Sequence, residues 1–474
     1  MEKFDVIVIG MGPSSIFLAY ELIKKSKNKK VLLIDQGKRV ENRKCPIESL
    51  GKCVKCKPFC NITSGFSGAG AFSDGKLSLY NPNDDDIYVG GNLHNYIGVE
   101  ETKKLIDYTD KIYLDFGADK HLEGIQYKEE ISQISEKARK ENIKLIDIPI
   151  RHLGTEKAHE IYKRLEEYLE EHNILMKFET IVDDLIIENN EIKGVSTISA
   201  KNENNKELFY SDKVVIAVGR KGANWLSNIC IKYGIKTKSG IVDIGVRYEL
   251  EDKVMKNINK YLYEGKFIGY PAPFKDKVRT FCMNPNGIVV NENTNGIVTV
   301  NGHSYEGAEK QTENTNFALL VAKHFSEPFK DSNGYGESIA RLSNMLGGGV
   351  IVQRFGDLMR GRRSTEKRIE EGLVKPTLAA TPGDLSLVLP KRILDGIIEM
   401  IYALDKIAPG TANDDTLLYG VEVKFYNMEV EIDNNLETRY KGLYIIGDGS
   451  GVTHSLSHAS ASGVYVARKI IEEM

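Results

Sequence analysis

The chain has 474 residues, and its 64 basic side chains nearly balance its 67 acidic ones, which gives a net charge of −3. With 41% hydrophobic and 28% charged residues, the composition excludes a disordered chain. The near-neutral balance does not favour nucleic acid as a partner. No apolar run reaches the ~20 residues of a membrane helix, and no secretory signal opens the chain. Six cysteines are too few for a secreted disulfide scaffold, so we expect a cytoplasmic protein without membrane contact.

The first 36 residues have the pattern of a dinucleotide-binding βαβ unit. A β-branched run at 4–9 precedes two spaced glycines, and a helical segment at 16–23 precedes a second apolar run at 31–34. The glycines permit a tight turn and close approach of a pyrophosphate, and the helix N-terminus offers it N–H groups. An acidic residue at this distance binds ribose hydroxyls. A Gly-rich turn of another α/β domain is the alternative. The predicted contacts are Gly10, Gly12, Pro13, Ser14, Ser15, Asp35 and Gln36.

Two later segments resemble the FAD-binding oxidoreductase superfamily. Residues 442–449 form an apolar run that ends in Gly447-Asp448, before a helical segment at 452–471, and residues 213–219 form an apolar run that ends at Gly219. In that superfamily the acidic residue binds the ribityl chain of FAD, and the following helix points its N-terminus at the isoalloxazine ring. The resemblance therefore implies FAD contacts by Gly219, Gly447, Asp448 and Ser455. It also implies an adenine contact by the backbone of Val182, in a predicted β-meander between 176 and 210.

The wider chain looks like an FAD-dependent dehydrogenase family of largely unassigned substrate. Residues 68–77, 151–155 and 242–249 carry this resemblance, which covers essentially the whole chain. It implies an α/β fold: a Rossmann-type FAD-binding domain, with a parallel sheet and a β-meander, over residues 1–240 and 336–474, including a helical excursion at 81–145. A β-rich substrate or cap domain is expected at 241–335. The small-residue loop after residue 64 is expected to approach the flavin, through Gly68, Gly70, Ala71 and the nearby Lys76.

Electrons must reach the flavin by a route other than a second nucleotide domain. Gly347-Gly348-Gly349 follows no convincing strand, so the chain lacks the phosphate loop of a separate NAD(P)H domain. NAD(P)H is therefore expected only as a transient donor. The alternatives are electrons from the substrate or from an electron-carrier protein.

Four of the six cysteines cluster as C-x7-C-x2-C-x3-C, at Cys45, Cys53, Cys56 and Cys60. Such spacing suits an all-cysteine iron–sulfur or zinc site, which we favour as an electron relay into FAD. A redox pair formed by Cys53 and Cys56 is a second interpretation. Thiols that merely pack, or an oxidised loop, are a third.

Several side chains are candidates for catalysis. The β-rich segment contains Arg279 and a predicted turn that presents His303, and His454 follows the Gly-Asp pair, where it could stabilise reduced flavin. Arg360, Arg362 and Arg363 form a basic cluster that suits either an anion or a solvated helix end.

We predict an FAD-dependent oxidoreductase that performs hydride or two-electron transfer at flavin N5 on a small organic substrate. The alternatives are a tRNA-modifying or other RNA-acting flavoprotein and a non-catalytic flavin electron-transfer subunit.

Overall fold

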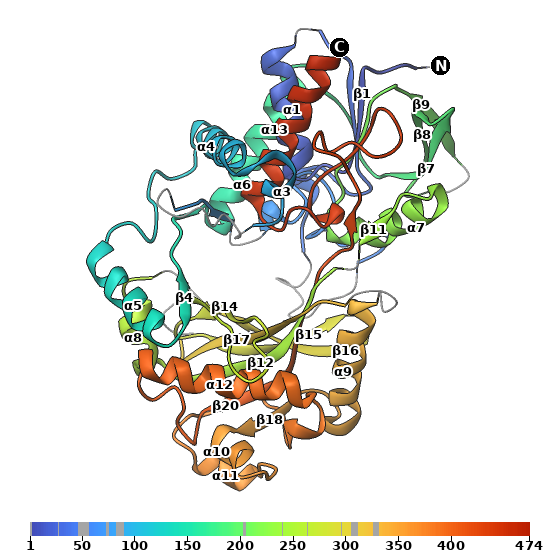
Figure 1. Cartoon of the computed structure of the whole chain (residues 1–474). Helices are drawn as coiled ribbons and strands as arrows, with labels where there is room; N and C mark the ends of the chain where they lie inside the picture. Colours follow the sequence, from blue (N-terminus) through green and yellow to red (C-terminus); the bar gives the residue numbers. More distant parts are fainter. Residues whose placement is uncertain are drawn as a thin grey trace. The chain divides into compact units, whose positions relative to one another are not determined.

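The computed structural model divides into two compact units (Figure 1). Unit 1 comprises residues 1–122, 148–238 and 427–474, and unit 2 comprises residues 123–147 and 239–426. The structure describes residues 2–26, 28–45, 56–72, 75–81, 90–201, 205–238, 240–262, 264–294, 296–304, 311–325 and 331–474.

Unit 1 is built on a five-stranded parallel sheet with the order β22-β10-β1-β2-β6. The strands are β22 (Leu443–Ile445), β10 (Val214–Ile216), β1 (Val6–Ile9), β2 (Val31–Ile34) and β6 (Leu175–Lys177). The first four are short apolar runs buried throughout, as expected where both faces of a parallel sheet are covered.

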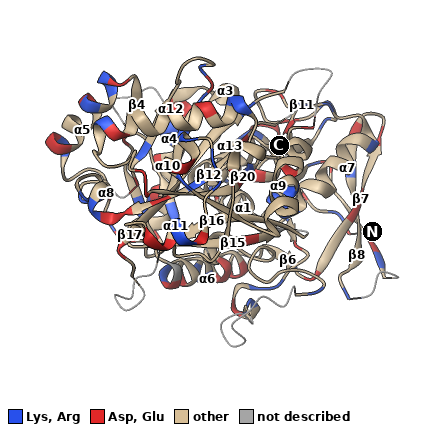
Figure 2. Cartoon of the chain, turned by 90° about the horizontal axis from the view of Figure 1, so that it is seen from below, with Lys and Arg blue, Asp and Glu red and all other residues tan. Residues whose placement is uncertain are grey.

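The two faces of this sheet have separate hydrophobic cores. Helices α1 (Pro13–Lys25), α4 (Val99–Asp115), α6 (Thr155–Glu171) and α13 (Leu456–Glu473) contribute to one core. The other core joins the sheet to α7 (Ala223–Tyr233) and to the predicted β-meander, which consists of β7 (Thr180–Glu188), β8 (Glu191–Ser199) and β9 (Lys206–Tyr210). The outer side of α6 carries acidic and basic residues interspersed (Figure 2), including the pairs Arg164–Glu160 and Lys163–Glu167.

Shorter elements complete unit 1. Two small sheets pair β3 (Lys76–Ser78) with β5 (Ile150–His152) and β11 (Thr237–Lys238) with β21 (Glu429–Val430). The remaining helical segments are α3 (His94–Ile97), η1 (Val40–Asn42), η2 (Gly70–Phe72), η3 (Arg220–Gly222) and η6 (Asp448–Ser450).

Helices α1 and α13 lie side by side (Figure 1). A Cβ atom on Gly463 of α13 would stand 2.0 Å from the carbonyl oxygen of Ser14 in α1. A side chain at position 463 would therefore push the helices apart, and the glycine permits their close packing.

Unit 2 is built on an eight-stranded sheet with the order β19-β18-β20-β12-β17-β14-β13-β4. Neighbouring strands are antiparallel except β18 and β19. In chain order the strands are β4 (Ile143–Ile146), β12 (Val242–Glu251), β13 (Lys266–Gly269), β14 (Val278–Asn284), β17 (Asn314–Lys323), β18 (Ile351–Arg354), β19 (Thr381–Pro382) and β20 (Leu417–Phe425).

One face of this sheet packs on the apolar stripe of α12 (Lys391–Ile407). β15 (Ile288–Thr294) and β16 (Ile297–His303) form a separate antiparallel ribbon. The other helical segments are α5 (Lys128–Lys140), α8 (Asp252–Asn259), α9 (Ser332–Gly347), α10 (Phe355–Met359), α11 (Glu366–Glu371) and η5 (Leu385–Leu387).

The mixed α/β fold, with its parallel sheet, meander and β-rich second unit, is as predicted, but the units divide at other residues. The sequence analysis assigned residues 336–426 and 123–147 to the FAD-binding domain, whereas they lie in unit 2. The physical reason is strand pairing: β20 pairs with β12, and β4 pairs with β13. Both segments therefore complete the unit 2 sheet.

Among the described residues, no helix combines the length and the apolar character needed to cross a membrane.

Candidate functional site

The predicted FAD contacts of unit 1 follow the carboxyl ends of adjacent parallel strands. Gly10 follows β1, Asp35 follows β2, Gly219 lies just beyond β10, and Gly447 lies just beyond β22. Because these strands are neighbours and parallel, their ends meet at one edge of the sheet. Ligands of open α/β sheets bind at this edge.

The turn between β1 and α1 is shaped for a phosphate group. Gly10 has φ of +96°, and a Cβ there would stand 2.8 Å from the carbonyl oxygen of Ala217, so glycine is required. Gly12 caps α1, Pro13 begins the helix, and no described atom lies within 4 Å of where a Cβ of Gly12 would be. Open space at a helix N-terminus suits an anionic pyrophosphate. Ser15 donates its hydroxyl to the carbonyl of Gly10 at 2.6 Å.

Asp35 is held against this turn. Its carboxylate accepts hydrogen bonds from the backbone N–H groups of Met11 (2.9 Å) and Gly37 (2.7 Å). Burial raises the pKa of Asp35 on balance, although those bonds and the nearby Arg43 lower it. The neighbouring Gln36 donates to Ser64 Oγ at 3.1 Å.

Asp448 lies at the other end of the predicted FAD path. Thr453 Oγ1 donates to its carboxylate at 3.1 Å, and Arg220 Nε lies 3.8 Å from it. Burial raises the pKa of Asp448 to about 6, against the lowering effect of these two neighbours. Gly447, the preceding residue, has φ of +76°, and a Cβ there would stand 3.0 Å from Ser14 Oγ.

The small-residue loop at 65–70, which was predicted to approach the flavin, lies against the nucleotide turn. Ser67 donates its backbone N–H to the carbonyl of Met11 at 2.8 Å, and Phe66 donates to that of Lys38 at 3.0 Å. A Cβ on Gly68 would stand 3.5 Å from the Cα of Gly12.

Arg43 holds this loop in place. It is 2% exposed, and its guanidinium donates to Ser67 Oγ at 2.9 Å and to four backbone carbonyls, those of Asn61, Ile62, Phe66 and Gly68. The guanidinium also lies over the ring of Phe72, 4.5 Å from its centroid. Burial lowers the pKa of Arg43 to about 10, so it is charged at neutral pH.

The N-terminus of α13 carries two buried polar side chains. Ser455 caps the helix and lies 3.2 Å from His458 Nδ1. Within the described part of the chain, His458 Nε2 and Ser457 Oγ have no hydrogen-bond partner. Burial, with His94 and His454 nearby, lowers the pKa of His458 to about 3, so its ring is neutral at neutral pH. These groups and the helix N-terminus fit the polar edge of a cofactor ring.

The other predicted FAD contacts occupy separate places in unit 1. Gly70 and Ala71 lie in η2, and a Cβ on Gly70 would stand 2.7 Å from Tyr162 Oη. Lys76 lies on β3, half-buried. Val182 lies on β7, which begins beside Asp35, since Thr180 donates to the carbonyl of Asp35 at 3.0 Å.

The predicted metal ligands are described in part. Cys45, Cys56 and Cys60 are half-buried free thiols, and Cys53 lies outside the described residues. No group of three His, Cys, Asp or Glu side chains in the described ranges could hold a metal ion. Burial raises the pKa of Cys60, but hydrogen bonds at Ile62 and Thr63 and the nearby Lys221 lower it on balance.

In unit 2, Arg279 is part of a polar cluster. Its Nε and Nη2 donate to Asp243 Oδ2 at 3.0 and 2.6 Å, and Tyr426 Oη contacts both residues. His303 lies elsewhere: it is exposed at the end of β16, because the strand continues through the predicted turn and pairs His303 with Ile288.

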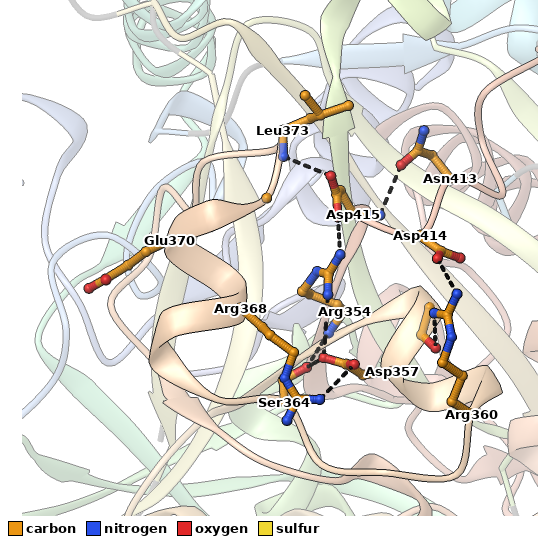
Figure 3. A network of polar contacts seen from close by, with 12 residues as sticks. Arg354, Asp357, Arg360, Ser364, Arg368, Glu370, Leu373, Asn413, Asp414 and Asp415 are labelled. Carbon is orange, nitrogen blue, oxygen red and sulfur yellow. Dashed lines mark hydrogen bonds and ion pairs between the residues drawn. The ribbon is translucent and has the colours of Figure 1, made fainter.

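Two arginines of the basic cluster after Asp357, Arg360 and Arg362, are paired with carboxylates. Arg362 donates to Asp357, which is fully buried. Arg368 also donates to Asp357, and Arg360 donates to Asp414 at 2.6 Å (Figure 3). Arg354 contacts Asp357 and Asp415 in the same network. These contacts favour a structural role for Arg360 and Arg362 over the binding of an anion.

The sequence did not indicate that Arg43 holds the 65–70 loop, or that Asp243 is the partner of Arg279. A signal for Asp243 was present. Polar residues alternate with apolar ones along β12, at Asp243, Arg247 and Glu249, and all three are buried. Alternation of polar and apolar residues on a buried strand indicates that one face of the sheet buries polar side chains, which then need hydrogen-bond partners.

Residues 244–425 match the family model described as "FAD-dependent protein, C-terminal domain-like". The match lies within unit 2 and covers less than half of the chain. It confirms the resemblance to FAD-dependent proteins for this segment. An uncharacterized protein of Clostridium beijerinckii is 25% identical over 99% of this chain and 81% of its own length.

Three solved structures are similar at a lower level. E. coli quinol fumarate reductase is 13% identical over 100% of this chain and 71% of its own, with a TM-score of 0.44. L-proline dehydrogenase from P. horikoshii is 15% identical over 100% and 94%, with a TM-score of 0.41. Glycine oxidase from Bacillus cereus is 13% identical over 99% and 96%, with a TM-score of 0.37. Likenesses of this size do not specify a substrate.

Proposed function

We propose that this chain is an FAD-dependent oxidoreductase whose unit 1 holds the cofactor. The observation that carries the proposal is the meeting of four segments at one edge of the parallel sheet: the Gly12 turn, Asp35, Gly219 and the Gly447-Asp448 pair. The family described for residues 244–425 supports the same cofactor.

Each of these segments would bind a different portion of FAD. The open space at Gly12 and the N-terminus of α1 would hold the pyrophosphate, and Asp35 would bind the adenosine ribose. Asp448 would bind the ribityl chain, and the N-terminus of α13 would face the polar edge of the flavin. When bound, FAD supplies two-electron transfer at N5, and the protein supplies orientation and charge.

The source of electrons is a further part of the proposal. A small organic substrate reacts with the flavin, and a transient NAD(P)H or a carrier protein exchanges electrons with it. The four clustered cysteines, which would bind an iron–sulfur cluster or zinc, are the candidate relay. Cys60 is the cysteine nearest to the 65–70 loop in the sequence, and its carbonyl accepts hydrogen bonds from the backbone N–H groups of Thr63 and Ser64, which lead into that loop.

Anaerobic purification followed by absorbance spectroscopy tests the proposal. We expect bound FAD, and reduction of its spectrum by NADH, NADPH or reduced ferredoxin. Analysis for iron, acid-labile sulfide and zinc tests the relay separately. Asp35→Ala should weaken FAD binding, whereas Asp212→Ala, which removes a carboxylate that is 57% exposed and paired with Lys3, should not. Equal FAD content in the two variants would reject the assignment of Asp35.

A further inference from the structure

Two cations, Lys277 and Arg279, stand two positions apart at the start of β14 in the unit 2 sheet. Val278 and Thr280 of β14 point into the core, so Arg279 points to the opposite face. Lys277 is the residue that precedes the strand, and it is close enough to Arg279 for that cation to lower its pKa. Neither is fully exposed: Lys277 is half-buried, and the side chain of Arg279 is 15% exposed.

Arg279 has a donor left over. Asp243 occupies Nε and Nη2, and Tyr426 Oη also contacts Nη2. Within the described residues, Nη1 makes no hydrogen bond, while the paired side of the guanidinium is fixed in orientation. The arginine is therefore held ready to donate to one more acceptor.

Lys277 is only partly compensated by its neighbours among the described residues. Its ammonium makes no ion pair or hydrogen bond with them, and burial together with the nearby Arg279 lowers its pKa, although Asp243 acts in the opposite direction. A half-buried ammonium beside a second cation is costly unless an anion balances it.

The surroundings of Arg279 are apolar as well as charged. The guanidinium lies over the ring of Phe281, 4.6 Å from its centroid. Ile268 stands opposite Arg279 in the β13–β14 ladder, and Leu320 stands opposite it on β17. These side chains would contact carbon atoms of a ligand bound at the cations.

The donors specify the kind of anion. Asp243 is paired with Arg279, whereas the ammonium groups of Lys266 and Lys424 also lie near the ring of Phe281, at 5.9 and 5.6 Å from its centroid. A carboxylate is an anion with two acceptor oxygens, one for Nη1 of Arg279 and one for Nζ of Lys277.

We propose that Lys277 and Arg279 bind the carboxylate of a small organic acid through Nζ and Nη1, with Phe281 and Ile268 beside its carbon skeleton. That this acid is the substrate rests on the proposed function, while the binding site itself does not.

Isothermal titration of the full chain with hexanoate, and with hexanamide as its uncharged counterpart, tests the site. We expect one hexanoate to bind and hexanamide to bind much more weakly. Lys277→Gln and Arg279→Gln should each weaken hexanoate binding by roughly tenfold or more, as loss of a charge-assisted hydrogen bond does. Lys277→Arg keeps the charge and should retain binding.

Lys253→Gln is the matched control, because Lys253 is 73% exposed and pairs with Glu251 elsewhere in unit 2. Equal affinity of Lys277→Gln and Lys253→Gln would overturn the proposal, as would equal binding of acid and amide, or no binding of hexanoate, phenylacetate or succinate. FAD content is measured on the same samples. A chain that holds FAD but binds no acid rejects this inference alone, and a chain that binds the acid without FAD rejects the proposed function alone.

Discussion

Arg43 donates a hydrogen bond from Nη1 to Oγ of Ser67 at 2.9 Å. Arg43 lies outside the dinucleotide pattern, and this bond connects it to the nucleotide turn through Ser67. Ser67 in turn contacts the nucleotide turn, because its backbone N–H donates to the carbonyl of Met11 at 2.8 Å. The loop that contains Gly68, close to Gly12, is therefore positioned by one buried guanidinium. FAD affinity should depend on this guanidinium although it need not touch the cofactor.

Arg43→Lys tests that dependence. Lysine keeps the charge but cannot reach five acceptors with one ammonium group, so buried carbonyls lose their donors. We expect the free energy of unfolding to fall by about 2–4 kcal/mol, and FAD affinity to fall with it, as measured by urea denaturation and by FAD titration. Lys44→Gln, at the exposed neighbouring position, should change neither. Wild-type stability and FAD affinity in Arg43→Lys would show that the loop needs no such support.

Gly463→Ala should destabilise the protein by crowding two helices. The added methyl group would stand 2.0 Å from the carbonyl oxygen of Ser14, a backbone atom that can move only if α1 and α13 separate. Overpacking of this kind costs about 1–3 kcal/mol. Denaturant unfolding of the FAD-free chain measures the cost, and an unchanged midpoint would mean that the helices pack less closely than described.

Gly12→Ala should leave the stability of the FAD-free chain unchanged and weaken FAD binding. No described atom lies within 4 Å of the new methyl group, so the FAD-free chain should keep its stability. The methyl group would fill the space proposed for the pyrophosphate, so FAD affinity should fall at least tenfold, by roughly 1.4 kcal/mol or more. Gly219→Ala gives a second test, because its Cβ position is also open. Retention of full FAD affinity in Gly12→Ala would place the pyrophosphate elsewhere.

Asp448→Asn should make the FAD-free protein more stable at neutral pH. The folded chain holds the pKa of Asp448 at about 6, above the ordinary value of 3.8, because partial burial of the carboxyl outweighs the lowering effect of Arg220 and Thr453. A raised carboxyl pKa means that the folded state binds the proton more tightly, so stability falls as pH rises between these two values.

The resulting penalty is about 2–3 kcal/mol above pH 6 and vanishes below pH 4. Thermal unfolding from pH 3.5 to 8 should therefore show that the melting temperature of the variant rises relative to that of the wild type as the pH increases from about 4 to 6. A difference that does not change with pH would contradict the raised pKa.

Most of unit 1 could be predicted because its signals are local. Short apolar runs that end in glycine or aspartate mark buried parallel strands, and four of these strands are neighbours in the sheet. The meander was similarly visible as alternating segments, and its first strand begins at Thr180, beside Asp35. Such patterns depend on residues close together in the chain.

The division into units depended on distant pairing. Nothing near residues 417–425 indicates that this segment pairs with β12, about 170 residues earlier along the chain. The role of Arg43 was hidden for a similar reason, because its acceptors are backbone carbonyls, which every residue carries. The pairing of Arg279 with Asp243 crosses from β14 to β12 and skips a strand.

Asp357→Asn should destabilise unit 2 strongly, because one buried carboxylate serves several cations in the network of Figure 3. Asp357 is fully buried and accepts hydrogen bonds from Ser364 Oγ (2.8 Å), Arg362 Nε (2.8 Å) and Arg368 Nη1 (3.0 Å). Burial raises its pKa, but these donors and nearby Arg354 lower it below 3.8 on balance.

Removal of one partner from a buried ionic network costs about 3–5 kcal/mol. A lowered carboxyl pKa adds stability that is complete above the unfolded value and is lost as pH falls through the folded value. Urea denaturation should therefore find a constant deficit for Asp357→Asn above about pH 5, which shrinks as pH falls below about 4. Arg360→Gln is the control, since its contact with Asp414 joins two side chains that are 52% and 55% exposed, and it should leave stability unchanged. An equal loss in both variants would assign the stabilisation to surface charge and remove the special role of Asp357.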